Sequence, residues 1–304
     1  MNPRARPRVS IGMPVFNGAT YIRDALDSLL AQTYADFEII IADNASTDAT
    51  EATCREYTMR DSRIRYVRHR ENRGIVANFQ HVLDEAVGDY FMWAAADDTW
   101  DPQWIETLLP IASEHQCLAY GLVQTADAHG LQVAHPANTR RFEFRGNRTL
   151  RRLRYYWQLA PLGKGNPIYG IAPTSLLRHI GIQWVESEEQ GGDMLWLYVL
   201  LDQTEIRHGG RVFLYKRLHG DCTGATVGPG PIQHKPSRAV RLVSFLRIVT
   251  AAPMVTRYIK HSSTMEAVVL AALYPASITL TAGVLLSDAL KRRLPRLPRA
   301  NNQP

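Results

Sequence analysis

Short apolar runs alternate with segments of helical periodicity over residues 9–124, and this alternation constrains the fold more than any other feature. Runs of strand length occupy residues 9–13, 37–42, 64–67, 90–96 and 118–123. Between them, apolar residues recur three and four positions apart, as on one face of a helix. This order builds βαβ units. The sequence therefore predicts an α/β protein with a mainly parallel sheet flanked by helices.

Composition limits the class of protein. The chain has 304 residues, 45% of them hydrophobic, which is enough to bury one substantial core. Its three cysteines are far apart, so a disulfide framework is not indicated and a reducing compartment fits best. The first residues lack the apolar segment of a secretory signal, so we expect a cytoplasmic protein. A net charge of +6 indicates an anionic partner, such as nucleic acid, a membrane surface or a phosphorylated substrate.

The regular alternation fades beyond Asp127. From this change and a later helical pattern we expect three parts in the chain. Residues 1–125 form the first half of the α/β domain. Residues 126–235 are polar and rich in Arg, Gly and Pro, and we expect them to shape the pocket of a second substrate. Residues 236–304 have a helical pattern and form a C-terminal appendage.

The appendage contains an uncharged run at residues 267–287 that is long enough to cross a bilayer. It is followed by basic residues at 291–293, which would favour a cytoplasmic C-terminus. Pro275 and several hydroxyl side chains make the run only moderately apolar. We therefore favour peripheral attachment at the inner face of the membrane, or plain packing, over a true span.

Paired carboxylates, Asp97 and Asp98, follow the strand expected at 90–96. Open α/β sheets bind ligands at the carboxyl ends of their strands, and carboxylate oxygens suit Mg²⁺ or Mn²⁺ that carries a diphosphate. The pair therefore points to phosphate-linked chemistry. A second polar cluster, at 43–48, follows the strand expected at 37–42. It is either a ligand site or a turn that ends the strand and caps the next helix.

Four segments occur in a defined order and spacing: VSIGMPVFNG at 9–18, IIIADNASTD at 39–48, ENRG at 71–74 and GDYFMWAAADD at 88–98. Together they resemble the family 2 glycosyltransferases with the GT-A (Rossmann-like) fold. The resemblance implies an inverting enzyme that moves a sugar from a UDP-, GDP- or dTDP-sugar to an acceptor hydroxyl. It also implies a saccharide or lipid-linked acceptor and a place in polysaccharide or glycolipid biosynthesis.

The resemblance further implies roles for single residues of the first half. Asp98, with Asp97, would meet a divalent metal, Mg²⁺ or Mn²⁺. Many family members carry another Asp where this chain has Ala95, so strict metal dependence is expected less firmly than nucleotide binding. The residues implied in nucleotide binding are Pro14, Phe16, Asp43, Arg73 and Asp97.

A later segment, residues 190–196, is similar to the family segment that presents the catalytic base before a helix. Inversion needs a carboxylate beside the acceptor hydroxyl, on the side of the sugar opposite the leaving diphosphate. We assign this role to Asp193. The alternative is that Asp193 only caps a helix starting at Met194, since Asp is a favoured N-cap.

His219 falls where some relatives place a residue that closes over the diphosphate or joins the metal. An isolated His is more often a surface or packing residue. Lys216 and Arg217 are equally plausible partners for the phosphates.

An arginine cluster precedes three aromatic residues at 155–157. Arginines with aromatic residues can bind nucleic acid, hold an acceptor phosphate or rest on anionic lipid. A solvated helix face is the usual alternative, and we favour it, so nucleic acid is not expected as a partner. The cluster comprises Arg140, Arg141, Arg145, Arg148, Arg151, Arg152 and Arg154.

Competing functions divide into other enzymes and a non-enzyme. A nicotinamide-dependent dehydrogenase needs a glycine-rich turn that residues 14–18 lack, and Gly163-Lys164-Gly165 lacks the spacing of a P-loop kinase. The remaining rival is a catalytically silent GT-A-like protein that binds membrane or nucleic acid through the arginine cluster.

Overall fold

The computed structural model describes residues 6–182, 191–218 and 258–272. The chain divides into two compact units, which are residues 1–158 with 162–231, and residues 159–161 with 232–304. In the second unit, the described residues are helical at 258–260 and 264–272.

None of the helices within these ranges is both long and apolar enough to span a bilayer. Most of the run at 267–287 lies outside the described residues, so its relation to a membrane stays a prediction.

A five-stranded sheet forms the centre of the first unit, in the order β3-β2-β1-β4-β7. Its first four strands are parallel, and β7 pairs antiparallel with β4. Strand β2, which lies between β3 and β1, is buried along its whole length, as expected for an apolar strand covered on both faces. The predicted α/β fold with a mainly parallel sheet is confirmed. The strands are β1 (Val9–Val15), β2 (Phe37–Asp43), β3 (Ile64–Arg68), β4 (Tyr90–Trp93) and β7 (Ala172–Pro173).

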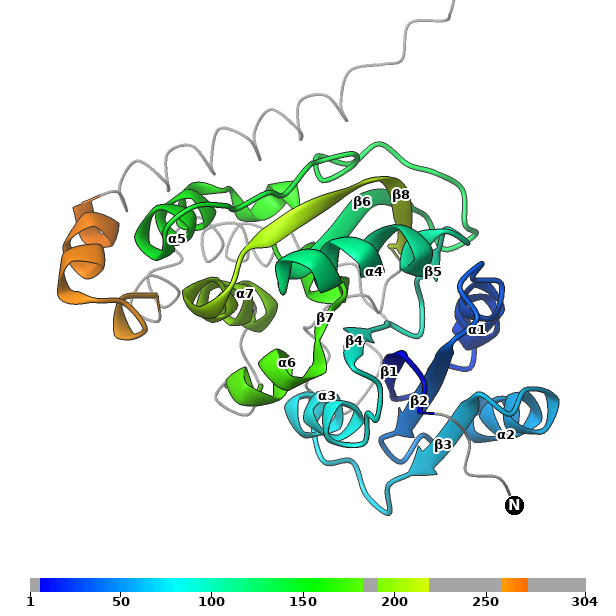
Figure 1. The fold of residues 1–304 in the computed structure, drawn as a ribbon. Coiled ribbons are helices and arrows are strands. Elements are labelled where there is room, and N and C mark those ends of the chain that lie inside the picture. Colours follow the sequence, from blue (N-terminus) through cyan, green and yellow to red (C-terminus); the bar gives the residue numbers. More distant parts are fainter. Residues whose placement is uncertain (1–5, 183–190, 219–257, 273–304) are drawn as a thin grey trace, which may run out of the picture. The chain divides into compact units, whose positions relative to one another are not determined.

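Helices cover both faces of this sheet, as Figure 1 shows, with α1 and α2 on one side and α3 and α6 on the other. The buried stripe of α1 consists of Ile22, Ala25, Leu26 and Leu29, which recur at helical spacing. Complete burial of a Leu or Ile side chain contributes about 1.5–3 kcal/mol, so this stripe anchors the helix. The helices are α1 (Ile22–Leu30), α2 (Thr50–Arg60), α3 (Ile75–Asp84) and α6 (Thr174–Ile180).

A second sheet has the order β5-β8-β6, in which β8 is antiparallel to β5 and parallel to β6. Helix α4 (Trp104–His115) packs against β6 and β8, and Trp104 meets Tyr120 edge to face at 5.7 Å. Its strands are β5 (Thr99–Trp100), β6 (Leu118–Ala126) and β8 (Ile206–Arg217).

Two expectations about regular structure are wrong. The strand expected to reach residue 96 ends at Trp93, because the chain turns after Ala94 and enters the second sheet at Thr99. Residues 126–235 were expected to be less regular, yet they contain the long strand β8. Helices α5 (Arg148–Trp157) and α7 (Gly192–Gln203) lie there as well and pack on each other.

Candidate functional site

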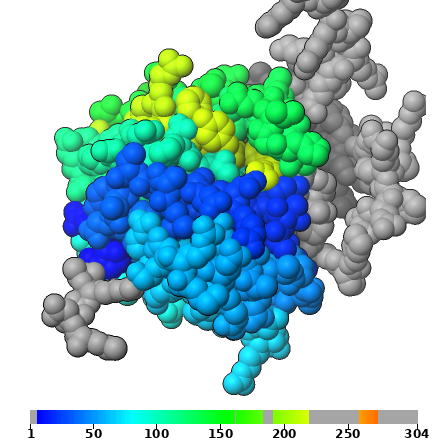
Figure 2. Space-filling view, turned by 90° about the vertical axis from the view of Figure 1, so that its right-hand side faces the viewer, coloured from blue at the N-terminus to red at the C-terminus, as the bar shows by residue number. Residues whose placement is uncertain are grey.

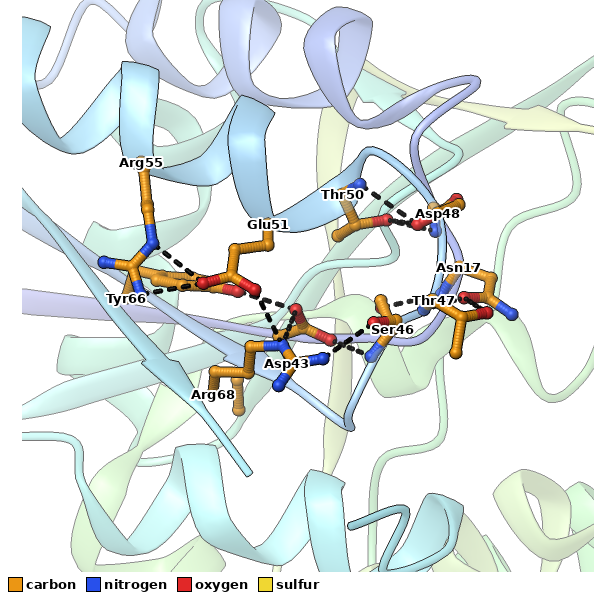
Figure 3. Close-up of polar contacts among 12 residues, drawn as sticks. Asn17, Asp43, Ser46, Thr47, Asp48, Thr50, Glu51, Arg55, Tyr66 and Arg68 are labelled. Atoms are coloured by element: carbon orange, nitrogen blue, oxygen red, sulfur yellow. Dashed lines mark hydrogen bonds and ion pairs between the residues drawn. The ribbon is translucent and has the colours of Figure 1, made fainter. Parts of the chain in front are cut away.

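The loops after β1 and β2 are joined by hydrogen bonds at the carboxyl edge of the first sheet (Figure 3). The amide nitrogen of Asn17 donates to Ser46 Oγ at 2.9 Å, and Asn17 Oδ1 accepts from the amide of Thr47 at 2.8 Å. Asp48 accepts from the amide of Thr50 at 3.0 Å, at the start of α2. These bonds fix both loops before any ligand is present.

Two residues of these loops adopt the left-handed backbone region. Asn17 has φ 52° and Ala45 has φ 64°. For a residue with a Cβ such as alanine this conformation costs roughly 1–2 kcal/mol, and it persists where surrounding contacts impose it. The hydrogen bonds on both sides of Ala45 supply those contacts.

Asp43, the last residue of β2, is completely buried. Its carboxylate accepts hydrogen bonds from the amide of Ser46 at 2.8 Å and from the Tyr66 hydroxyl at 2.6 Å, and it lies 3.6 Å from Arg68 Nε (Figure 3). Burial, and then this hydrogen bond, raise the pKa of the Tyr66 hydroxyl far above its usual range. A role of Asp43 toward a nucleotide base stays a prediction, because both carboxylate oxygens already interact with protein groups.

The other residues predicted to bind the nucleotide lie near the same edge of the sheet, at the end of a strand or on the loop that follows one. Pro14 is half-buried in β1, whereas Phe16 and Arg73 are exposed. Asn44 fixes the loop that carries Arg73, because its Oδ1 accepts from the Arg73 amide at 2.8 Å and its Nδ2 donates to Asn72 Oδ1 at 2.7 Å. Sequence reasoning did not assign this role to Asn44, and its position directly after Asp43 was the available signal.

The Asp97–Asp98 pair follows β4 and lies against the loop after β1. A Cβ added at Gly18 would lie 3.5 Å from the Cβ of Ala96, which brings the two loops into contact. Asp98 is 2% exposed, and its Oδ1 accepts a hydrogen bond from the Arg217 amide at 2.9 Å. Burial, followed by the charge of Asp97, raises the pKa of Asp98 to about 7. Burial and the neighbouring charge of Asp97 therefore both disfavour the ionised form of Asp98.

The two basic residues at the end of β8 face different groups. The Arg217 guanidinium donates to Asp24 Oδ2 at 2.8 Å, and this ion pair joins β8 to α1. Figure 2 shows the yellow end of β8 lying against the blue N-terminal segments. Lys216 instead donates to Asn166 Oδ1 at 3.3 Å and lies 5.8 Å from the centre of the Tyr169 ring.

Strand pairing also places Lys216 near the paired carboxylates. Thr99 pairs with Tyr215 in the antiparallel register of β5 and β8, so the preceding residue Asp98 lies opposite Lys216. The ammonium group favours the ionised form of Asp98, against the larger effects of burial and Asp97. Lys216 is thus the better placed of the two basic residues to meet a phosphate, while His219 lies outside the described residues.

Asp193 lies in the first turn of α7 and is exposed. The helix begins at Gly192 with Gly191 as its N-cap, so the alternative interpretation, a helix that starts at Met194 with Asp193 as its cap, is wrong. Asp193 Oδ1 nevertheless accepts a hydrogen bond from the Met194 amide at 2.8 Å. The carboxylate is therefore oriented by the helix terminus that carries it.

Tyr169 lies among the three candidate carboxylates. Burial, and then the charges of Asp98, Asp97 and Asp193 in that order, raise the pKa of its hydroxyl well above the usual value. Contacts link the same groups: Asp193 lies against Gly165, the next residue Asn166 accepts from Lys216, and Lys216 lies opposite Asp98 and 5.8 Å from the centre of the Tyr169 ring. Tyr169 was not predicted from the sequence, because a single tyrosine outside a motif carries no signal.

Lys164 is a buried charge beside this group. Its Nζ lies 5.1 Å from the centre of the Tyr155 ring and donates to the carbonyl of Tyr156 at 3.4 Å. Burial lowers the pKa of the Lys164 ammonium to about 7, and the charge of Asp193 opposes this shift. In the sequence, Lys164 stands out only in Gly163-Lys164-Gly165, which lacks the spacing of a P-loop.

Two arginines of the cluster, Arg151 and Arg152, are committed to contacts within the protein, whereas the other five are exposed. Arg152 is completely buried, donates to Asp202 Oδ1 at 2.7 Å and stacks 4.2 Å from the centre of the Tyr198 ring. Arg151 donates to the carbonyl of Leu201 at 2.6 Å, at the C-terminal end of α7. Cations stabilise helix C-termini, so the favoured expectation of a solvated face is wrong for these two arginines.

The fit of a divalent metal can be judged from the chemistry of the donor groups. In the described part of the chain, no group of three or more His, Cys, Asp or Glu side chains is arranged to hold a metal ion. Asp97 and Asp98 offer two hard oxygen donors whose mutual repulsion a cation would relieve. Mg²⁺ commonly uses one or two carboxylates together with substrate phosphates. The pair therefore fits a cation that a bound diphosphate helps to hold.

Comparison with known protein families gives a match to the family model described as "Glycosyl transferase family 2" over residues 10–169. An uncharacterized glycosyltransferase of Rickettsia bellii is 36% identical over 134 residues, which covers 42% of this chain and 19% of that protein. The putative teichuronic acid biosynthesis glycosyltransferase TuaG of Bacillus subtilis is 34% identical over 112 residues, covering 37% and 44% respectively. The chain thus aligns with less than half the length of each relative.

Solved structures extend the similarity over most of the chain. The structure of S. aureus TarS 1-349 in complex with UDP-GlcNAc has a TM-score of 0.57 at 15% identity, covering 95% of this chain and 93% of that one. GalNAc-T7 with UDP, GalNAc and Mn²⁺ has a TM-score of 0.55 at 12% identity, covering 80% and 48%. At these identities, the likeness establishes a shared fold.

Proposed function

The chain belongs to the family 2 glycosyltransferases, and on this premise we propose that it transfers a sugar from a nucleoside diphosphate donor to an acceptor hydroxyl, with inversion. The proposed donor is a UDP-, GDP- or dTDP-sugar, and the proposed acceptor is a saccharide or lipid-linked saccharide of polysaccharide or glycolipid biosynthesis. The proposed setting is the cytoplasm, with peripheral contact at the inner face of the membrane. TarS in complex with UDP-GlcNAc and the teichuronic acid relative TuaG support the substrate classes.

The observation that carries this proposal is a series of contacts that joins the three carboxylates: Asp193 lies against Gly165, the next residue Asn166 accepts a hydrogen bond from Lys216, and Lys216 lies opposite Asp98. Asp97 and Asp98 supply the end of the site suited to the diphosphate, and Asp193 supplies a carboxylate from a different element, the first turn of α7. A displacement with inversion needs these two functions on opposite sides of the reacting carbon. The arrangement therefore supports direct transfer.

At the diphosphate end, negative charge grows as the bond from the sugar to the phosphate breaks. A divalent ion held by Asp97 and Asp98 would neutralise part of this charge when it is bound. Lys216 adds a fixed ammonium group from the opposite strand, next to Asp98. Lys216 thereby offers the diphosphate a positive charge that does not depend on a metal ion.

At the acceptor end, Asp193 accepts the proton of the attacking hydroxyl group. The acceptor oxygen forms a bond to the anomeric carbon, the bond from that carbon to the diphosphate oxygen breaks, and the electron pair leaves with the diphosphate. The exposure of Asp193 leaves it accessible to an acceptor. Its hydrogen bond to the Met194 amide orients the carboxylate during this step.

Calorimetry with UDP, GDP and dTDP, with and without Mn²⁺, tests the proposed donor class. We expect one of the three nucleotides to bind with clearly higher affinity than the others. In a screen of nucleotide sugars, we expect slow hydrolysis of donors that carry the same base. Failure of all three nucleotides to bind would refute the enzyme function. Salt-sensitive RNA binding with indifference to nucleotides would support the rival, a catalytically silent protein.

A further inference from the structure

The turn Gly163–Asn166 lies between the two charged ends of the proposed site. The amide of Asn166 donates to the carbonyl of Gly163 at 3.0 Å and closes the turn. The Tyr155 hydroxyl lies 3.2 Å from the carbonyl oxygen of Lys164 and 3.0 Å from that of Met194. One side chain of α5 thus ties this turn to the first turn of α7, where Asp193 lies.

The Asp193 carboxylate rests directly on the Cα atom of Gly165. A Cβ added at Gly165 would overlap Asp193 Oδ2, and it would lie 2.7 Å from Cγ and 3.3 Å from Oδ1 of the same side chain. Gly165 has φ −80° and ψ −21°, which any L residue can adopt. Backbone conformation therefore does not require glycine here. What its missing side chain provides is room for the carboxylate.

The next residue of the turn contacts the other end of the site. Asn166 is 6% exposed, and its Oδ1 accepts the hydrogen bond from Lys216 at 3.3 Å. The strand register sets Lys216 opposite Asp98. A buried amide that binds an ammonium group restricts the rotamers of a long, flexible lysine.

We infer that the turn Gly163–Asn166 is a positioning element, in which Gly165 sets the direction of the Asp193 carboxylate and Asn166 sets that of the Lys216 ammonium group. One short segment thereby fixes the spacing between the proton-accepting end and the diphosphate-binding end. The inference rests on the proposed function, which gives Asp193 and Lys216 their roles. Gly165 and Asn166 act through these side chains and need no contact with the substrate.

The first test is Gly165→Ala. The added methyl group displaces the end of a flexible side chain in a backbone that tolerates alanine, so the variant should fold with an unchanged melting temperature. We expect kcat for transfer to fall by about 100-fold, because small displacements of catalytic groups have effects of this size. The donor KM and the Kd for the nucleoside diphosphate should stay within about twofold of the wild-type values, since Gly165 lies at the acceptor end.

The double variant Gly165→Ala with Asp193→Ala separates positioning from general packing. With the carboxylate gone, the methyl group has nothing to displace, so the double variant should match Asp193→Ala in both activity and melting temperature. A further loss of activity or stability in the double variant would show that the glycine serves packing, and would overturn the inference.

The second test compares Asn166→Ala with Asn166→Asp in EDTA. Asn166→Ala releases Lys216, so we expect about a tenfold loss of affinity for the nucleoside diphosphate and little change for the monophosphate. Asn166→Asp keeps an oxygen acceptor and should retain affinity within about threefold. Asn147→Ala, which removes the cap of α5, is the control for lost stability and should leave both affinities unchanged.

The outcomes distinguish this inference from the proposed function. Normal transfer by Asp193→Asn would refute the assignment of the base, and with it the mechanism. If Asp193→Asn is inactive while Gly165→Ala transfers at the wild-type rate, the positioning role of Gly165 is wrong and the proposed function stands. Unchanged diphosphate affinity in Asn166→Ala would remove the positioning role of Asn166.

Discussion

Two regions along the site bury carboxylates in different ways. At the end of β2, Asp43 is completely buried and interacts with Ser46, Tyr66 and Arg68. Near Tyr169, Asp98 is almost as buried, but it lies beside Asp97 and its pKa rises to about 7. The first carboxylate is stabilised by the protein, whereas the second has a desolvation cost that the Arg217 amide and the Lys216 ammonium offset only in part.

The difference indicates that the first carboxylate stabilises the fold and that the second is suited to ligand binding. A charge that the fold fully compensates supports structure, because removal leaves its partners unsatisfied. A charge that the fold leaves poorly compensated is suited to a ligand that brings the opposite charge. We therefore expect substitutions in the first region to lower stability, and substitutions in the second region to lower activity or binding without lowering stability.

The largest effect is expected for Asp193→Asn. The amide cannot accept the proton of the acceptor, so kcat should fall by about 10³-fold, within the usual range for loss of a general base. Asn can still accept the hydrogen bond from the Met194 amide, so the melting temperature should hold. Steady-state kinetics and thermal unfolding check the two expectations. Lost stability with normal kcat would instead favour a capping role.

Asp43→Ala should lower the free energy of unfolding by about 3 kcal/mol, because it leaves the Tyr66 hydroxyl and the Arg68 guanidinium without their carboxylate. Urea unfolding measures this loss. The matched substitution in the other region is Asp97→Ala, which we expect not to lower the free energy of unfolding, because it removes the charge that opposes ionisation of buried Asp98. Equal losses in the two variants would remove the contrast between the regions.

Asp98→Asn should act in opposite directions on binding and on stability. Binding of the nucleoside diphosphate with Mn²⁺ should weaken roughly 50-fold, since one charged oxygen donor is lost. In EDTA and without nucleotide, the free energy of unfolding should rise by about 1 kcal/mol, because a buried charge next to Asp97 is removed. Calorimetry and urea unfolding test the pair of effects, and a destabilised apo variant would contradict our account.

Lys164→Met gives a pH-dependent test of the buried lysine. The pKa of Lys164 is lowered to about 7 in the folded protein, from 10.5 in the unfolded chain. The folded state therefore disfavours the proton, and the resulting cost is complete below pH 7 and disappears as the pH rises toward 10.5. The stability advantage of the Met variant should be about 3 kcal/mol smaller at pH 9 than at pH 6. A constant difference between these pH values would contradict burial of the charge.

The smallest effect is expected for Ala45→Gly. Glycine adopts positive φ without the strain of a Cβ, but it also increases the entropy of the unfolded chain. We expect a net gain of about 0.5 kcal/mol in the free energy of unfolding. Ala42→Gly, in the extended and buried part of β2, is the control and should destabilise the protein.

The first sheet was predictable because local patterns determine it. Buried parallel strands read as apolar runs, and the stripe of α1 recurs at helical spacing, so both signals are present in short windows of sequence. Strand β8 carries no such signal, because Gly209 and Gly210 interrupt it where its register with β6 shifts. Its partners also lie far away in the chain, and pairing with them decides the structure.

The same reasoning explains which site residues the sequence revealed. Asp97, Asp98 and Asp193 stand in motifs, and contacts through the turn at Gly165 and Asn166 and through Lys216 connect them in the fold. Asn166 and Tyr169 lie in a short helical turn without a motif, and their role appears only through contacts between distant segments. The prediction of a solvated face was wrong for Arg151 and Arg152, because the sequence does not show that Asp202 and the end of α7 lie beside them.

Strand β8 has a consequence for the order in which the chain can become functional. The parallel strands β1 to β4 are complete by Trp93, but Asp98 receives its hydrogen bond from Arg217 and the Lys216 ammonium arrives with the same strand. When synthesis has reached about residue 200, the parallel strands β1 to β4 can already be paired, but the edge of β6 that pairs with β8 is still unpaired. Catalytic competence therefore arrives late in translation, after a stage in which the growing polypeptide is vulnerable to aggregation.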